Sequence, residues 1–367
     1  MSEHSVQSEL ATPRQRILIF CLSGLGDVLL ASPALDALSR RSSSFQLTLL
    51  TMFPSVKEYL EDQGFTSDVR FIDVFRWSKM KILREFLKLR SERFDVSILP
   101  YAMNRLEYNA VSFLVGARLR VGFRYRRQRI VNLPFLNHRL FDEDLAMHVV
   151  DENLRWASLL TGTVRSELPD ELRFEVPPQA MAAAETFLAQ QHVDSEANLV
   201  GIHPGCNSLK NQHRRCWPPE HFARLIENLR RKDPSFRFVL FEGPQDGVFA
   251  DKIRALVPGT ISAKLLPMSL VGALIRKCRI FLSNDSGLMH VAAACKVPTV
   301  VLFGPTNPAW VHPWKNRSAI VRQDLPCSPC FYYSSRPLAC PARLDYACVR
   351  DLRVEDVESE VIRLATP

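Results

Sequence analysis

The sequence has no long hydrophobic run. No stretch reaches the roughly 18 uncharged apolar residues that a transmembrane helix requires. Near the start, the apolar run Ile17–Leu22 has only the length of a strand before Gly24, Gly26 and Asp27 interrupt it. Residues 1–16 are polar and charged, which is not the pattern of a secretory signal peptide. We therefore expect a cytoplasmic protein without a membrane span.

The sequence also has fewer acidic residues than basic ones. The 367 residues carry a net charge of +8, with a pI near 9.1. A basic balance favours an anionic partner such as nucleic acid, a phospholipid surface or a phosphorylated acceptor. No recognisable nucleic-acid module accompanies the basic residues, so we expect no nucleic-acid partner. A hydrophobic content of 47% and a length sufficient for two cores predict a two-domain globular protein.

The nine cysteines are an odd number, and without a secretion signal they predict reduced thiols rather than disulfides. Four of them cluster near the C-terminus: Cys327, Cys330, Cys340 and Cys348. The first pair has zinc-like spacing, but the second pair is too widely spaced for a zinc ribbon. Reduced or redox-labile thiols are the favoured interpretation and a structural metal at Cys327, Cys330, Cys340 and Cys348 the alternative.

The most informative stretch is 280–305, which reads IFLSNDSGLMHVAAACKVPTVVLFGP. It predicts a strand Ile280–Ser283, a polar turn, a helix Leu288–Cys295 and a second strand Thr299–Phe303. The first N–H groups of a helix lack partners within it and suit phosphate oxygens. Asp285 in the turn is a candidate helix cap. An ordinary capped helix without a ligand is the alternative interpretation.

A second strand–turn–helix unit lies near the N-terminus. A strand Arg16–Cys21 leads through Gly24 and Gly26 into a predicted helix Val28–Arg40, which places Asp27 at the start of that helix. Its carboxylate would point out of the carboxyl edge of a parallel sheet. The third glycine of a dinucleotide-binding fingerprint is missing. On local sequence alone, Asp27 as a helix N-cap is the alternative.

These stretches resemble the lipopolysaccharide heptosyltransferases of glycosyltransferase family 9. In that family D-[TS]-G-x-x-H precedes A-A-x-x-x-P and a G-P-T, and the D-[TS]-G turn binds the donor diphosphate. The resemblance thus implies a donor site made by the matching residues Asp285, Ser286, Gly287, His290, Gly304 and Thr306. The N-terminal motif, matched from Gly26 to Leu35, implies that Asp27 is the general base.

Two further segments extend the resemblance. The loop HPGCNSLKNQHRRCWPPEHF is similar to a family segment with a basic residue before Trp-Pro, which implies that Gly205 and Asn207 approach the phosphates. Cys216 interrupts the usual order, so the phosphate-neutralising residue is left open among Arg214, Arg215 and Lys210. The segment ARLRVGFRYRRQR matches a third motif. Its arginines Arg118, Arg120 and Arg124, with Gly24 and Gly26, are candidate acceptor contacts; a solubilising basic loop is the alternative.

Residues Lys79–Arg93 predict a basic amphipathic helix with an apolar stripe of Ile82, Phe86 and Leu89. A solvated helix face is the ordinary interpretation, and a membrane-surface or acceptor-facing helix is the alternative. Asp142-Glu143-Asp144 forms a D-x-D string, but it lies in an acidic loop, and we do not interpret it as a metal site.

The resemblance covers about residues 16–350 and implies the GT-B architecture, in which two Rossmann-like α/β domains face each other across a cleft. We predict a flexible tail at 1–15, an acceptor domain at 16–168, a Pro-rich linker at 169–180, a donor domain at 181–350 and a C-terminal helix at 351–367.

The function so implied is metal-independent, inverting transfer of a sugar from a nucleotide-diphosphate donor, the nucleotide-sugar co-substrate, to an anionic glycolipid, with no cofactor required. Heptose from an ADP-linked donor and a lipopolysaccharide-core-like acceptor are the family's pattern. Peripheral contact with the inner face of a membrane is expected. A nucleotide-sugar epimerase or hydrolase of the same fold, which would need no acceptor, and a non-catalytic nucleotide-sugar-binding scaffold remain alternatives.

Overall fold

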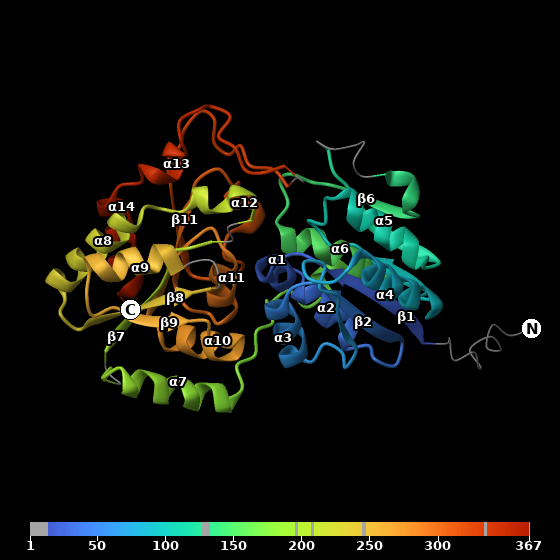
Figure 1. The fold of residues 1–367 in the computed structure, drawn as a ribbon, viewed down its shortest axis with the longest axis horizontal. Helices are drawn as coiled ribbons and strands as arrows, with labels where there is room; N and C mark the ends of the chain where they lie inside the picture. The colour runs from blue at the N-terminus through green and yellow to red at the C-terminus, as the bar shows by residue number, and fades with distance from the viewer. Residues whose placement is uncertain are drawn as a thin grey trace, which may run out of the picture.

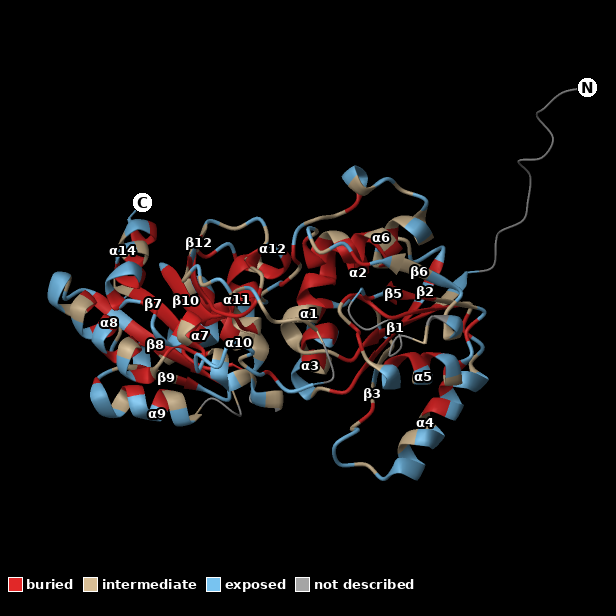
Figure 2. Cartoon of the chain, turned by 90° about the horizontal axis from the view of Figure 1, so that it is seen from above, coloured by how far each residue is buried: buried red, intermediate tan, exposed pale blue. Residues whose placement is uncertain are grey.

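The computed structural model describes residues 14–126, 133–194, 197–206, 209–243, 247–333 and 336–366. Within them the chain forms two parallel six-stranded sheets, each covered by helices on both faces, which lie side by side (Figure 1). Strands at the centre of each sheet are buried, whereas the outer helices expose one face (Figure 2). The predicted α/β architecture of two Rossmann-like halves is confirmed.

The N-terminal sheet has the strand order β3-β2-β1-β4-β5-β6. Its strands are β1 Gln15–Cys21, β2 Phe45–Thr51, β3 Val69–Phe71, β4 Val96–Ile98, β5 Leu119–Arg124 and β6 Arg139–Asp142. Ile17 pairs with Leu47 on one side and Val96 on the other. Because all strands are parallel, their carboxyl ends meet at one edge, and the loops at that edge lead into the helices.

Alternate residues of β1 serve two separate cores. Ile17 and Ile19 pack under the helices α1 Leu25–Leu30, α2 Ser32–Ser39, α3 Pro54–Gln63 and α6 Val149–Thr161. Leu18 and Phe20 pack on the opposite face, under α4 Lys79–Ser91 and α5 Leu106–Val115. This two-sided burial follows from the period of two along a strand. It makes α4 and α5 a complete outer layer of this domain.

The C-terminal sheet has the order β12-β11-β10-β7-β8-β9. Its strands are β7 Asn198–His203, β8 Phe236–Glu242, β9 Ile261–Lys264, β10 Ile280–Asn284, β11 Thr299–Phe303 and β12 Ser318–Arg322. The helices α7 Pro178–Gln190, α10 Met268–Lys277 and α11 Gly287–Ala294 cover one face, and α8 Pro219–Lys232, α9 Gly247–Leu256 and α14 Val354–Ala365 cover the other. The short helices are α12 Pro308–Val311, α13 Ala347–Arg350, η1 Pro134–Leu136, η2 Arg165–Glu167 and η3 Leu209–Arg215.

The helix predicted at Val28–Arg40 is two helices, so that prediction is wrong in one respect. α1 ends at Leu30, Ala31 joins the two, and α2 begins at Ser32 with Pro33 in its first turn. Proline has no N–H to donate and its ring clashes with the carbonyl four residues earlier, so it is tolerated only where a helix begins. The break leaves α1 as a short element at the carboxyl edge of the sheet.

The two domains pack directly against each other. α1 lies on α11 and α3 lies on α10, and one hydrophobic cluster runs through both domains. The connecting segment is better anchored than its few apolar residues suggested. Phe174 is buried, stacks on Tyr59 with 5.7 Å between ring centroids, and fills the space above Gly272. The structure therefore holds the domains in contact around their facing carboxyl edges. In the parts that the structure describes, no helix has the length and apolarity needed to cross a bilayer.

Candidate active site

The site forms where the loop after β1 meets the loop after β10. A Cβ atom on Gly26 would lie 3.0 Å from Cα of Gly287 and 3.1 Å from Cδ2 of His290. Such distances are tighter than most real Cβ contacts, so any residue other than glycine would push α1 and α11 slightly apart. The two motifs found in the sequence, more than 250 residues apart, are thus in direct contact.

Asp27 lies in the first turn of α1, the helix that packs against α11 of the other domain. Gly24 occupies the N-cap position and α1 has no side-chain cap, so the alternative that Asp27 caps this helix is wrong. Burial raises the pKa of Asp27 to about 6; nearby Asp285 raises it further, and Arg215 opposes the rise. A carboxylate with such a pKa is ionised at neutral pH and more basic than an ordinary aspartate. These are the properties of a general base.

Asp285 forms an ion pair with an arginine and does not cap a helix. Its Oδ2 accepts a hydrogen bond from Nη1 of Arg215 at 2.8 Å, and the same nitrogen lies 3.3 Å from Oγ1 of Thr306. The prediction that Asp285 caps α11 is wrong, because Ser286 occupies the N-cap position. Nε of Arg215 is buried and has no partner among the described residues. A buried guanidinium fixed by a carboxylate is suited to binding a phosphate group.

The structure also shows which of the three candidate cations, Arg214, Arg215 and Lys210, lies next to Asp285. Arg214 points away from Asp285: its guanidinium lies over the ring of Tyr346 and 3.9 Å from Asp345, and half of its side chain is exposed. Lys210 is half-buried, and the positive charge of Arg105 in the N-terminal domain contributes to the lowering of its pKa, after burial. Only Arg215 reaches the Asp285 turn.

The N-cap residue of α11 belongs to a small hydroxyl network. Oγ of Ser286 lies 2.7 Å from Nδ1 of His203 at the end of β7 and 2.9 Å from Oγ of Ser283. Asn284 braces the neighbouring loop, because its side chain donates to the carbonyl of Pro204 and accepts from the N–H of Trp217. The turn that presents the first N–H groups of α11 is therefore rigidly held.

His290 sits one turn inside α11 and is buried. Burial lowers its pKa to about 4; Asp285 raises it, while His312 and Arg215 lower it further. The imidazole is thus neutral at physiological pH. Its Nδ1 has no hydrogen-bond partner among the described residues, and its ring touches the position of Gly26. A neutral ring with a free nitrogen beside Asp27 is available to a ligand.

The remaining donor candidates differ in their surroundings. Gly205 is buried near the start of the loop that follows β7. Gly304 is required by packing, since a Cβ there would lie 3.0 Å from Cβ of Val349 and 3.2 Å from Sγ of Cys348. Its neighbour Thr306 is the residue of this segment that reaches Arg215. Asn207 lies outside the described residues.

Two of the candidate acceptor arginines are far from this site. Arg118 precedes β5 and Arg120 lies near its start, at the amino edge of the sheet, opposite to the edge that carries Asp27. Arg118 is exposed beside Asp95, and Arg120 donates to the carbonyls of Leu136 and Ala117. Their assignment to the acceptor site is therefore wrong.

The third arginine and the two glycines lie at the carboxyl edge of the sheet, the edge that carries Asp27. Arg124 ends β5 and forms an ion pair of 2.9 Å with Asp142. Gly24 caps α1 with open space around it, and Gly26 touches the other domain. Arg105, which caps α5 and stands over the ring of Tyr108, is a cation at this edge that sequence reasoning missed.

Glu143 joins the two domains and was also missed as a functional residue. Its buried carboxylate accepts hydrogen bonds from Tyr101, from the backbone N–H of Arg126 and, across the domain boundary, from Tyr332. The side chain of Asn104 donates to the carbonyl of Tyr333 at 2.7 Å. In the sequence, Glu143 stood out only as the middle residue of a D-x-D string that we did not interpret as a metal site, and nothing there indicated a contact between the domains.

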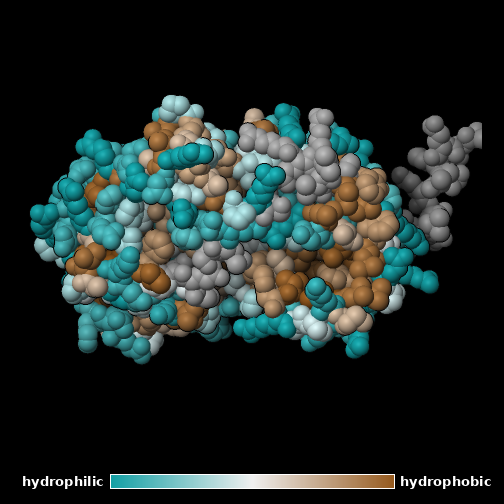
Figure 3. Space-filling view, turned by 45° about the horizontal axis from the view of Figure 1, so that its top comes forward, coloured by the Kyte–Doolittle hydropathy of each residue, from teal (hydrophilic) through white to brown (hydrophobic). Residues whose placement is uncertain are grey.

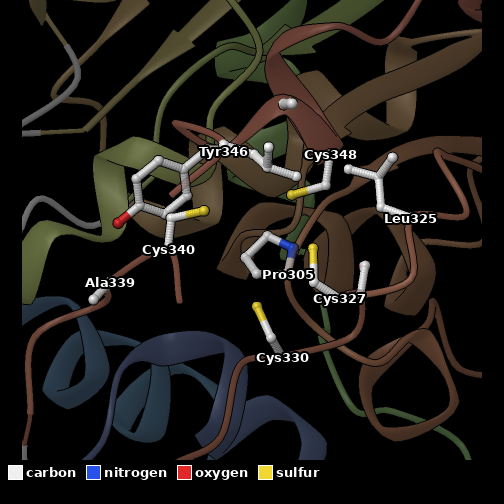
Figure 4. Close-up of a pocket in the computed structure, with 11 residues that line it drawn as sticks. Pro305, Leu325, Cys327, Cys330, Ala339, Cys340, Tyr346 and Cys348 are labelled. Atoms are coloured by element: carbon white, nitrogen blue, oxygen red, sulfur yellow. The ribbon is translucent and has the colours of Figure 1, made fainter. Parts of the chain in front are cut away.

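The four C-terminal cysteines line one pocket together with Pro305 and Tyr346 (Figure 4). The segment is tied to the site, since the N–H groups of Cys330 and Phe331 bond the carbonyl of Pro305. Burial raises the pKa of Cys348 to about 11. None of the nine cysteines forms a disulfide. Among the side chains that the structure describes, no group of three or more His, Cys, Asp or Glu is placed to hold a metal ion.

Comparison with known proteins supports what the geometry suggests. The family model of "Glycosyltransferase family 9 (heptosyltransferase)" matches residues 82–339. The chain is 23% identical over 357 residues to lipooligosaccharide heptosyltransferase 2 of Campylobacter jejuni, covering 96% of this chain and 100% of the relative.

Solved structures agree in fold. A family 9 glycosyltransferase from Veillonella parvula superposes with a TM-score of 0.74 at 19% identity, covering 96% of this chain and 97% of the other. The ADP-heptose lipopolysaccharide heptosyltransferase II of E. coli superposes with a TM-score of 0.71 at 19% identity, covering 96% and 98%. The predicted GT-B architecture is thereby confirmed. Because the family model matches well over half of the chain, this protein belongs to glycosyltransferase family 9, the heptosyltransferases.

Proposed function

We propose that this enzyme transfers a heptosyl group from ADP-heptose to an anionic, lipopolysaccharide-core-like glycolipid, with inversion at the anomeric carbon. The observation that carries the proposal is the contact between Gly26 and Gly287, which sets Asp27 beside the Arg215–Asp285 pair. The names of the relatives, heptosyltransferase 2 and ADP-heptose heptosyltransferase II, support the donor and the acceptor class.

In the proposed reaction, Asp27 accepts the proton of an acceptor hydroxyl as its oxygen bonds to the anomeric carbon of heptose. The bond from that carbon to the diphosphate oxygen breaks, and ADP leaves with the electron pair. Attack from the face opposite to ADP inverts the anomeric centre. The pKa of about 6 at Asp27 supports its role, since the group is ionised before transfer and can hold the proton afterwards.

Negative charge develops on the diphosphate as ADP leaves. We assign its stabilisation to the guanidinium of Arg215 and the first N–H groups of α11, at Gly287 and beyond. Asp285 contributes indirectly, because its own charge would repel phosphate and its carboxylate holds Arg215 in place. These groups provide the charge neutralisation that a divalent cation supplies in other transferases, so we propose that no metal is needed.

For the acceptor we propose residues of the N-terminal domain, 16–168, and for the donor the C-terminal domain, 181–350. Arg105 at the start of α5 lies close enough to Lys210 in the opposite domain for its positive charge to help lower the pKa of Lys210. Cations facing each other from both domains suit an acceptor that carries phosphate or carboxylate groups. Such an acceptor is anchored in lipid, so we place the enzyme in peripheral contact with the cytoplasmic face of a membrane.

The test is a thermal-shift and transfer experiment on the full chain. ADP-, GDP- and UDP-sugars, ADP-heptose included, are compared for their effect on Tm, since a ligand of the folded state raises it. We expect ADP-heptose to stabilise the wild type and to be consumed only when a core glycolipid is added, in EDTA as in buffer. Consumption without acceptor would indicate a hydrolase, and stabilisation without consumption a binding scaffold.

A further inference from the structure

The outer layer of the N-terminal domain combines exposed apolar and basic side chains. Fifteen large hydrophobic residues are exposed in the described parts of the chain, and eight of them lie between Val74 and Phe135. The region of brown residues on this half of the molecule is visible in Figure 3. Single exposed apolar residues are ordinary, but a group gathered in one layer marks an interaction surface.

Helix α4 has two apolar stripes. Phe86 and Leu89 face the sheet and are buried with Ile82 beside them, as the sequence predicted. A second stripe turns away from the sheet at the same helical spacing, and it comprises Met80, Leu83 and Leu87, which are 71%, 41% and 48% exposed. The first stripe is explained by the core, whereas no described residue of the protein covers the second.

Basic residues flank the outer stripe on both sides. At about 100° per residue, Lys79 and Arg90 fall along one side and Arg84 and Lys88 along the other. Residues 74–116, which hold α4 and α5, contain eight Lys and Arg against four Asp and Glu, a surplus of four that is half of the net charge of the chain. The layer that exposes these apolar residues therefore also carries a positive net charge.

This layer reaches the edge of the active site. Phe75, 62% exposed, follows β3, and Leu106, 43% exposed, begins α5, so both lie at the carboxyl edge of the sheet. The hydroxyl of Tyr108 in α5 donates to the carbonyl of Leu22, in the loop that leads to Asp27. A surface bound by this layer is thus adjacent to the catalytic loop.

We infer that the α4–α5 layer, Phe75, Met80, Leu83, Leu87 and Leu106 with the basic residues around α4, docks on an anionic phospholipid bilayer. Apolar side chains at this density enter the headgroup region, and lysines and arginines around them bind lipid phosphates. Charge complementarity favours this occupant over a second copy of the chain, because two such basic layers would repel each other. The inference names the surface by which the proposed function meets its lipid-anchored acceptor.

The experiment measures sedimentation of the purified full chain with vesicles of phosphatidylglycerol and phosphatidylethanolamine, compared with vesicles of phosphatidylcholine alone. We expect binding to the anionic vesicles that weakens as salt is raised. Met80→Ser/Leu83→Ser/Leu87→Ser should lower the partition coefficient at least about 10-fold. Lys79→Ser/Arg84→Ser/Lys88→Ser should lower it on the order of 100-fold, given the contribution of each basic residue at an anionic surface.

The matched control is Val248→Ser/Leu256→Ser/Leu265→Ser, which removes equally exposed apolar residues from the C-terminal domain. It should bind vesicles as the wild type does, and circular dichroism should show all variants folded. Equal loss in the control, or no binding by the wild type, overturns the inference. A wild-type dimer that the Met80 triple variant converts to monomer, seen by light scattering, would instead assign this face to self-association.

Because vesicle binding requires no donor, the inference can be tested apart from the transferase proposal. If transfer is observed, the variants should keep their rate on a deacylated, water-soluble acceptor and lose it on acceptor embedded in vesicles. Loss on both acceptors would mean that these residues act on the reaction rather than on the membrane. Vesicle binding without any transfer would leave the surface in place and refute only the proposed function.

Discussion

Arg215 and Asp285 form a largely buried ion pair, with 2.8 Å between Nη1 and Oδ2, at the point where the two domains meet. In the proposed function, the motif's aspartate therefore acts on the donor through a cation. A carboxylate facing a diphosphate alone would repel it, whereas a carboxylate that fixes a guanidinium keeps that group oriented before the donor arrives.

Replacing Arg215 by alanine should weaken donor binding about 10- to 100-fold, which corresponds to the loss of one or two charge-assisted hydrogen bonds. The neighbouring Arg214→Ala is the control, because its side chain points to Tyr346 and Asp345. Isothermal titration with ADP measures both. Equal losses in the two variants would contradict the assignment.

Replacing Asp285 by alanine should destabilise the protein by about 3 kcal/mol, because it leaves the Arg215 charge buried without its partner. Asp285→Asn keeps a hydrogen-bond acceptor, so its free energy of unfolding should fall by less. Urea denaturation gives the free energy of unfolding of each. A neutral effect of the alanine variant on stability would mean that water replaces the carboxylate.

Asp27→Asn should lower kcat about 100- to 10,000-fold with little change in donor affinity, since only proton transfer is lost. Its fold should be unchanged, because α1 is capped by Gly24 and does not depend on this side chain. Single-turnover transfer assays provide the measurement. Full activity of a folded variant would rule out Asp27 as the base.

The pH profile follows from the raised pKa of the same group. Below a pH of about 6, Asp27 is protonated and cannot accept the acceptor's proton, so kcat should fall about tenfold per pH unit on the acid side. Above that pH the base is ionised and this limb becomes flat. If kcat instead began to fall only near pH 4, the ordinary range of an aspartate, burial would not be raising the pKa of Asp27.

Gly26→Ala should lower both kcat/KM and Tm, because its Cβ would crowd Gly287 and His290 and force α1 and α11 slightly apart. The expected cost of overpacking is about 1 to 3 kcal/mol. Gly24→Ala is the control, since nothing lies within 4 Å of a Cβ there and its φ of −67° suits any residue. If both variants lost kcat/KM and Tm to a similar extent, the glycines would be needed to begin α1 rather than to allow contact between the domains.

Local sequence determined much of this protein. The periods of two and 3.6 residues predicted strands such as Thr299–Phe303 to the residue, because continuous apolar runs between turn residues leave few alternatives in a parallel sheet. The ordered motifs indicated the family and drew attention to Asp27 and Asp285. The strands β6 and β12 were not predicted, and the proline break after Ala31 was missed although Pro33 was visible in the sequence.

Tertiary structure alone decided which residues meet. No spacing distinguishes Arg215 from Arg214, since the choice depends on where the η3 turn aims each side chain. The spacing of residues in the sequence also does not show that Arg118 and Arg120 lie at the amino edge of the sheet, or that Glu143 joins the domains. Sequence patterns record which face of its own element a residue occupies, whereas contacts between domains depend on how two finished surfaces pack.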